Sequence, residues 1–116
     1  MSRPRRGDLW WVSLDPTRGD EISKTRPVVV LSGDEFGVLA VKIVVPLTKA
    51  ASSKLGKLWL VPIAPSPKNG LKVDAVADVL QMRSVSLDRF KTHMGRLGDA
   101  DLAEVTAAAG AVIVFA

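Results

Sequence analysis

Three residues that can act on a phosphodiester lie beside the apolar runs of this chain. Arg26 precedes Pro27 and the run 28–31, and Thr48 follows the next apolar run. Glu21 belongs to the charged loop before Arg26. An arginine fork can hold two phosphate oxygens, and a threonine hydroxyl can add a further hydrogen bond. These residue types therefore favour chemistry on a phosphate group.

This set of side chains suits a phosphodiester whose attacking group is supplied by the substrate itself. In RNA the 2′-hydroxyl is that nucleophile, and the protein must remove its proton, stabilise the pentacovalent phosphorus and protonate the leaving oxygen. The products would carry 2′,3′-cyclic phosphate and 5′-hydroxyl ends. Because arginine stays protonated near neutrality, we interpret Arg26 as an electrostatic stabiliser and proton donor. Glu21 or another group would then accept the 2′-hydroxyl proton.

Metal and cofactor chemistry has little support in the composition. The chain has no cysteine and a single histidine, His93, and no acidic cluster has the spacing of a metal-binding loop. Neither a Gly-x-Ser-x-Gly motif nor a Gly-rich phosphate loop occurs. We therefore expect no metal site and no cofactor.

The length of the chain suits one domain, which we assign to residues 1–116. Its basic start lacks the apolar segment of a secretory signal, and no apolar stretch reaches the ~18 residues of a membrane span. We therefore expect a cytoplasmic protein without membrane association. The net charge of +4 favours phosphate-bearing or acidic partners.

Short apolar runs predict a mainly β fold. Proline has no N–H to donate, so we expect Pro27 at the first position of a strand and Pro46 to stop one. Apolar residues recur at helical spacing only after Asp99, which can cap the helix. Short strands and one helix imply a small antiparallel sheet or barrel that packs a C-terminal helix. The predicted strands cover residues 9–14, 28–31, 38–47, 59–63, 74–80 and 92–97, with a short helical turn at 85–90 and a helix face formed by Leu102, Val105, Ala109 and Val112.

The connection between the first two predicted strands runs from Asp15 to Thr25, and it is longer than an ordinary hairpin loop. Long charged loops in compact domains are typical of binding sites, so we interpret it as a functional loop. Trp10 and Trp11 must face opposite sides of the first strand. We expect one tryptophan in the core and the other under a loop or at an interface.

Three motifs taken together resemble one protein family. They are Arg6-Gly7-Asp8-Leu9-Trp10-Trp11-Val12, Asp15-Pro16-Thr17-Arg18-Gly19-Asp20-Glu21 and Thr25-Arg26-Pro27-Val28-Val29-Val30-Leu31-Ser32. The pattern continues through Val45-Pro46-Leu47-Thr48, Gln81-Met82-Arg83-Ser84 and the terminal helix. Over nearly its whole length the chain resembles the MazF/PemK family of toxin endoribonucleases.

The resemblance implies an SH3-like barrel that forms a homodimer and cleaves single-stranded RNA at short sequences without a metal. It also implies a type II toxin-antitoxin system, in which the acidic tail of a MazE-like antitoxin covers the toxin. Arg26 and Thr48 match the catalytic pair of the family, and Glu21 matches a loop residue that affects activity. With the charges of the flanking loops, the resemblance predicts RNA contacts at Arg18, Asp20, Lys24, Lys49, Lys54, Lys57, Gln81 and Arg83.

Two departures from the family pattern concern recognition. The loop reads Gly19-Asp20-Glu21-Ile22 where Gly-Ser-Glu-Gln is common, and Leu80 stands where an acid usually precedes Gln81. The cleavage sequence therefore cannot be carried over. Two alternatives stay open, a gyrase-poisoning toxin of the same fold and a non-catalytic RNA-binding barrel. The gyrase poison depends on a Trp-Gly-Ile end, whereas this chain ends Ile113-Val114-Phe115-Ala116.

Overall fold

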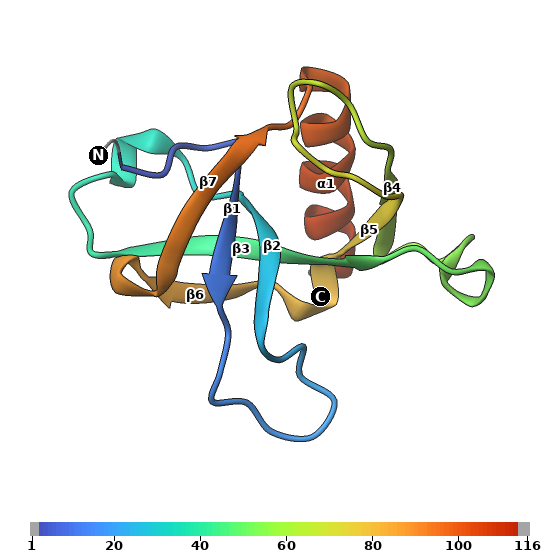
Figure 1. The fold of residues 1–116 in the computed structure, drawn as a ribbon, viewed down its shortest axis with the longest axis horizontal. Helices are drawn as coiled ribbons and strands as arrows, with labels where there is room; N and C mark the ends of the chain where they lie inside the picture. The colour runs from blue at the N-terminus through green and yellow to red at the C-terminus, as the bar shows by residue number, and fades with distance from the viewer. Residues whose placement is uncertain (1–2, 114–116) are drawn as a thin grey trace.

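A computed structural model describes residues 3–113, so the terminal residues 114–116 that distinguish the gyrase poison lie outside the described residues. The fold is mainly β, with seven strands, four 3-10 turns and one C-terminal helix (Figure 1). The elements are β1 (Asp8–Ser13), β2 (Thr25–Val30), η1 (Asp34–Phe36), β3 (Val41–Lys49), η2 (Ser52–Lys54), β4 (Leu60–Ile63), β5 (Ala75–Asp78), η3 (Val79–Gln81), β6 (Arg83–Ser86), η4 (Leu87–Arg89), β7 (Phe90–Arg96) and α1 (Asp99–Val112).

All strand pairs are antiparallel, and the long strand β3 connects the two halves of the sheet. The strand order is β4-β5-β3-β2-β1-β7, with β6 also paired to β3. Within residues 3–113 the end strands β4 and β7 are not paired with each other, so the predicted barrel is open. The mainly β fold with a C-terminal helix is confirmed.

Both proline predictions were wrong in their details. Pro46 does not stop its strand, because β3 continues to Lys49. Pro46 pairs with Val28 of β2. On the other side of β3, pairing with β6 ends at Val44 and pairing with β5 begins at Leu47, so Pro46 lies between the two pairings. The missing N–H therefore falls in a gap of the ladder. Pro27 is likewise the third residue of β2, paired with Trp11, two residues after the strand begins.

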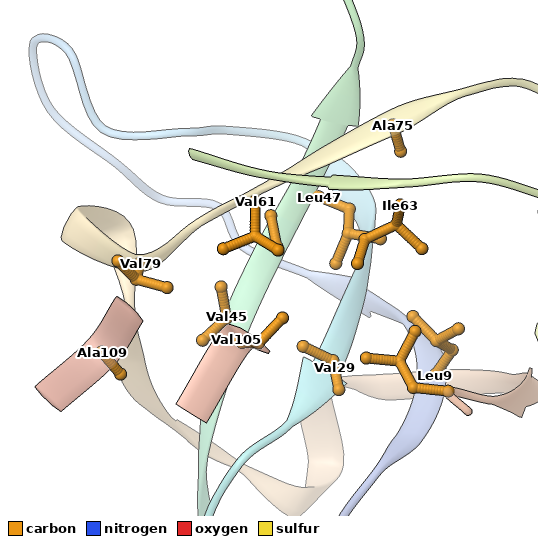
Figure 2. Close-up of a cluster of buried hydrophobic side chains, with 12 residues drawn as sticks. Leu9, Val29, Val45, Leu47, Val61, Ile63, Ala75, Val79, Val105 and Ala109 are labelled. Carbon is orange, nitrogen blue, oxygen red and sulfur yellow. The ribbon is translucent and has the colours of Figure 1, made fainter. Parts of the chain in front are cut away.

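The alternation of side chains along the strands builds two apolar clusters. Successive residues of a strand face opposite sides of the sheet. Val29 and Val45 therefore join the cluster that packs against α1 (Figure 2), whereas Val28 and Val44 join Trp10 on the opposite face. Trp10 is buried and Trp11 is 39% exposed, which confirms that the two tryptophans have different environments.

The C-terminal helix packs by the predicted face, since Val105 and Ala109 are buried and Leu102 packs beside them. Asp99 is not the cap: Gly98 holds that position, and Asp99 is the first helical residue. An acid there still interacts favourably with the helix dipole. The turn predicted at 85–90 is also shorter, because residues 83–86 form β6 and only Leu87–Arg89 is helical. Among residues 3–113, no helix has the length and apolar character needed to cross a membrane.

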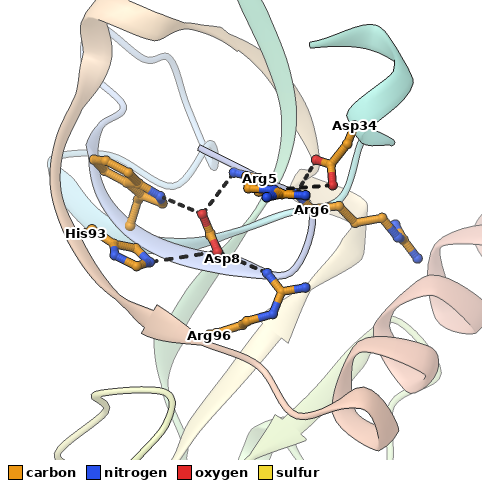
Figure 3. A network of polar contacts seen from close by, with 7 residues as sticks. Arg5, Arg6, Asp8, Asp34, His93 and Arg96 are labelled. Atoms are coloured by element: carbon orange, nitrogen blue, oxygen red, sulfur yellow. Dashed lines mark hydrogen bonds and ion pairs between the residues drawn. The ribbon is translucent and has the colours of Figure 1, made fainter. Parts of the chain in front are cut away.

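A buried carboxylate joins the start of the chain to β7. The Asp8 side chain is 12% exposed and accepts hydrogen bonds from the Arg5 backbone N–H at 2.9 Å and from Arg96 Nη1 at 3.1 Å (Figure 3). Trp10 Nε1 donates to it at 3.4 Å, and His93 Nε2 lies 3.8 Å away. Buried carboxylates are tolerated when they are paired in this way.

We predict that Asp8→Ala lowers the free energy of unfolding by about 2–3 kcal/mol, because it leaves the buried indole N–H of Trp10 and the Arg96 guanidinium without their acceptor. Urea denaturation measures this change. Asp34→Ala is the matched control, since Asp34 is 46% exposed and its contacts with the Arg5 side chain at 3.7 Å and the Arg6 backbone N–H at 2.8 Å lie at the surface. Its loss should cost less than ~1 kcal/mol. Equal losses in the two variants would contradict the role assigned to Asp8.

Candidate active site

The register of β2 and β3 brings the two predicted catalytic residues together. The pairs Val30–Val44, Val29–Val45 and Val28–Pro46 define the register, and two further steps along it set Arg26 opposite Thr48. Backbone pairing between β2 and β3 ends at Val28–Pro46, and Pro27 beside it has no N–H to donate. Beyond this point the strands border a cavity of about 140 Å³ that both Arg26 and Thr48 line.

The Arg26 side chain is half-buried and held by the loop that precedes it. Its Nε donates a hydrogen bond to the backbone carbonyl of Ser23 at 3.1 Å. Within residues 3–113 the terminal nitrogens of the guanidinium make no hydrogen bond, so they can bind a ligand in the cavity. This is the geometry in which an arginine fork can receive two phosphate oxygens.

The Thr48 hydroxyl already has one partner. Lys54 Nζ donates a hydrogen bond to Thr48 Oγ1 at 3.2 Å and a second to the backbone carbonyl of Lys49 at 3.0 Å. Lys49 lines the same cavity as Thr48, whereas Lys57 lies exposed in the loop that follows η2. Two of the three predicted lysines of this segment therefore adjoin the site.

The Glu21 carboxylate faces a different hollow from the one that holds Arg26. Its Oε1 accepts the backbone N–H of Arg18 at 2.6 Å, within the β1–β2 loop itself. Glu21 lines a neighbouring depression of about 460 Å³ together with Asp20, Gln81 and Arg83. Thus the structure brings four predicted residues into this second hollow, and it separates Glu21 from the Arg26–Thr48 pair.

The predicted RNA contact Gln81 holds the β1–β2 loop. Its Oε1 accepts the backbone N–H of Ile22 at 3.2 Å, and its Nε2 donates to the carbonyl of Asp20 at 3.0 Å. Arg83 Nη1 donates to the carbonyl of Leu14 at 3.1 Å, at the base of the same loop. Both side chains therefore fix the loop that carries Glu21.

The exposed ends of the loop side chains point away from the core. Arg18, Asp20 and Lys24 are exposed, and Lys24 has a φ of 69°, a left-handed conformation that is uncommon for a residue with a side chain. Its carbonyl accepts the backbone N–H of Leu14 at 2.9 Å. The loop is thus closed at its base while its tip presents charged groups to solvent.

The small cavity lies between two larger, mostly apolar hollows. It shares Trp11 and Leu71 with a hollow of about 450 Å³, and it shares Lys49 and Ala75 with one of about 630 Å³. Val73 lines all three. We call this continuous set of hollows the trough. The partly exposed Trp11 lies in the trough, outside the core, and its place at an interface stays a prediction.

Comparison with known proteins identifies the family. Residues 5–113 match the family described as PemK-like, MazF-like toxin of type II toxin-antitoxin system. The chain is 36% identical over 108 residues to endoribonuclease MazF9 of Mycobacterium tuberculosis, covering 87% of this chain and 88% of the relative. This chain belongs to the PemK/MazF toxin family. The family prediction made from the three motifs is therefore confirmed.

Solved structures of the PemK/MazF family support the fold. The crystal structure of MazF from Deinococcus radiodurans has a TM-score of 0.80 and 27% identity over 97% of each chain. A MazE-MazF crystal structure from the same organism has a TM-score of 0.71 at 23% identity, over 97% of this chain and 96% of that one. The antiparallel sheet with its C-terminal helix is thus the architecture of this family.

One residue beside the site was missed by the sequence reasoning. Asp78 of β5 faces the same side of the sheet as Thr48, because Thr48 pairs with Val76 and Asp78 lies two residues further on. Burial raises the pKa of the Asp78 carboxyl, while hydrogen bonds from backbone N–H groups and the charge of Lys54 act against this shift. The family motifs gave no indication of it, but an acid within an apolar strand was a visible signal.

Proposed function

We propose that this protein is the endoribonuclease toxin of a type II toxin-antitoxin system and cleaves single-stranded RNA without a metal ion. The observation that carries the proposal is the β2–β3 register, which directs Arg26 and Thr48 into one cavity. Family membership and the names of relatives such as endoribonuclease MazF9 support it. The site of action is the cytoplasm, where messenger RNA is translated.

In the proposed reaction the 2′-hydroxyl of the substrate attacks the adjacent phosphorus. The Arg26 guanidinium holds two non-bridging oxygens, and the Thr48 hydroxyl donates a hydrogen bond to the same phosphoryl group. The bond from phosphorus to the 5′-oxygen breaks, that oxygen takes a proton from Arg26, which regains one from solvent, and a 2′,3′-cyclic phosphate remains. The 2′-hydroxyl proton goes to Glu21 or to another base.

We predict that the purified protein cleaves a labelled single-stranded RNA in EDTA and leaves 2′,3′-cyclic phosphate and 5′-hydroxyl ends. Chromatography and mass spectrometry of the products identify these ends. A substrate with 2′-deoxyribose at the scissile nucleotide should stay intact, because it lacks the nucleophile. Cleavage of that substrate would refute the mechanism, and binding without any cleavage would favour an RNA-binding barrel.

The matched variants for this assay are Arg26→Ala and Thr48→Ala. Loss of one transition-state hydrogen-bond donor costs about 10²- to 10³-fold in rate, and the charged bidentate donor should cost at least as much. Arg26→Lys should restore activity only in part, because a point charge cannot reproduce the planar fork. Circular dichroism checks that each variant is folded. Activity of Arg26→Ala within a few-fold of the parent would refute the assignment.

We also propose that the toxin is a homodimer. An exposed apolar patch supports a contact between copies, because apolar patches of this kind mark interaction surfaces. It extends from η1 into the first half of β3, at the opposite end of β3 from Thr48. The patch consists of Phe36, Val38, Leu39, Val41 and Ile43, each between 43% and 91% exposed.

Val38→Asp should convert the protein from a dimer to a monomer, because Val38 is 91% exposed and an aspartate buried there would lose its hydration. Sedimentation equilibrium measures the mass. Leu58→Asp is the control, since Leu58 is 83% exposed in the loop before β4, outside the patch. A parent protein with the mass of one chain would contradict the dimer, as would a Val38→Asp variant that remains dimeric.

A further proposal concerns the antitoxin, an acidic MazE-like chain whose tail competes with RNA for the trough. The trough has apolar walls lined also by the cations Arg26, Lys49 and Lys72 and by one acid, Asp74. This excess of positive charge suits an extended chain with apolar anchors and acidic side chains. MazE-MazF complexes of structurally similar proteins support this pairing.

We predict that a short acidic peptide with apolar anchors inhibits RNA cleavage competitively and that its association rate falls as the salt concentration rises. Acidic groups speed the approach to a basic rim, and salt screens this attraction. Inhibition kinetics and stopped-flow association measure the two effects. Noncompetitive inhibition, or an association rate that salt leaves unchanged, would contradict a shared trough.

A further inference from the structure

The ammonium group of Lys54 is held in a defined position beside the proposed catalytic hydroxyl. It donates to Thr48 Oγ1 at 3.2 Å and to the Lys49 carbonyl at 3.0 Å, and the side chain is half-buried. Its charge also acts on the carboxyl of Asp78, which lies on the same face of the sheet as Thr48. Lysine side chains on a surface usually lack such fixed partners.

The direction of the hydrogen bond between Lys54 and Thr48 is unambiguous. An ammonium group has three donors and no acceptor, whereas a hydroxyl has one donor and two acceptor lone pairs. Thr48 Oγ1 must therefore accept from Lys54. The hydroxyl proton of Thr48 then points to another acceptor, and the cavity that it shares with Arg26 is where a phosphate oxygen would lie.

We propose that Lys54 is a positioning residue that fixes the Thr48 hydroxyl as a hydrogen-bond donor to the scissile phosphate. This inference rests on the proposed function, because it assigns a role in RNA cleavage. It differs from the simpler expectation that Lys54 is one of several lysines that attract the RNA backbone. A lysine that only attracts phosphate acts through substrate binding, whereas a positioning lysine acts through Thr48.

The two roles make different predictions for a double-mutant cycle. If Lys54 acts through Thr48, removal of Lys54 has no further effect once the Thr48 hydroxyl is absent. If Lys54 binds phosphate on its own, its removal weakens the Thr48→Ala variant as much as the parent. The cycle therefore separates the two roles without any assumption about the size of either effect.

The experiment compares the parent, Lys54→Met, Thr48→Ala and the double variant in RNA cleavage with EDTA. Methionine keeps an unbranched apolar stem and removes the donor. We expect Lys54→Met to lower kcat about tenfold or more and to change KM less than about threefold. Without Lys54 the Thr48 hydroxyl is no longer held in position, so the transition state loses one hydrogen-bond donor. The double variant should equal Thr48→Ala. Lys54→Arg should recover part of kcat, because arginine also donates.

Lys57→Met is the matched control, because Lys57 is exposed in the same segment and carries the same charge. As a predicted RNA contact, Lys57 should act through substrate binding, so Lys57→Met should raise KM and leave kcat unchanged, which is the effect expected of a lysine that only attracts the RNA backbone. Additive losses in the double variant, or a Lys54→Met effect confined to KM like that of Lys57→Met, would overturn the positioning role and leave the proposed function intact. A folded parent protein that cuts no RNA would instead overturn the proposed function, and the role of Lys54 would fall with it. Thermal melting shows that each variant is folded.

Discussion

The pairing register between β2 and β3 is the constraint on which both the core and the site depend. Val29 and Val45 meet in the cluster under α1 because of this register, and the same register sets Arg26 opposite Thr48. A slip of one residue would turn every side chain of β2 to the other face. It would exchange the valines of β2 between the two buried clusters, disrupt the packing of both, and separate the candidate catalytic pair at the same time. The apolar core therefore specifies the geometry of the site.

The β2–β3 ladder stops just before it reaches the candidate pair. Pro27 has no N–H to donate to β3, and backbone pairing ends at Val28–Pro46. The cavity that Arg26 and Thr48 line lies at this unpaired end of the two strands. Gln81 and Arg83 hold the β1–β2 loop by its backbone. A rigid pair of strands and a loop fixed by side chains meet at one edge.

The sequence was informative where local chemistry decides the structure. The apolar runs predicted the strands, and the Arg-Pro motif and the threonine after β3 were enough to propose a pair of residues. Pro46 was misjudged because its tolerance depends on a gap between β5 and β6, which no local pattern reveals. The hydrogen bond of Glu21 was not predicted either, because a side chain that accepts a backbone N–H of its own loop leaves no recognisable pattern in the sequence. The contact from Lys54 to Thr48 is also a tertiary one, formed when the chain after β3 turns back.

The charges around Thr48 determine which part of the reaction this site can support. Arg26 lines the same cavity as the Thr48 hydroxyl, and Lys54 donates a hydrogen bond to that hydroxyl. Both side chains are cations, so the site is better suited to stabilising negative charge than to accepting a proton. A transition state with two negative charges gains most from such fixed donors, because they need no reorganisation when the charge develops. Among residues 3–113, no acid lines the cavity that Arg26 and Thr48 share. Glu21 lines the neighbouring hollow, and Asp74 lines the larger hollow beside Lys49. Electrostatic stabilisation by this chain, with the nucleophile taken from RNA, is therefore the chemistry that these residues are arranged to perform.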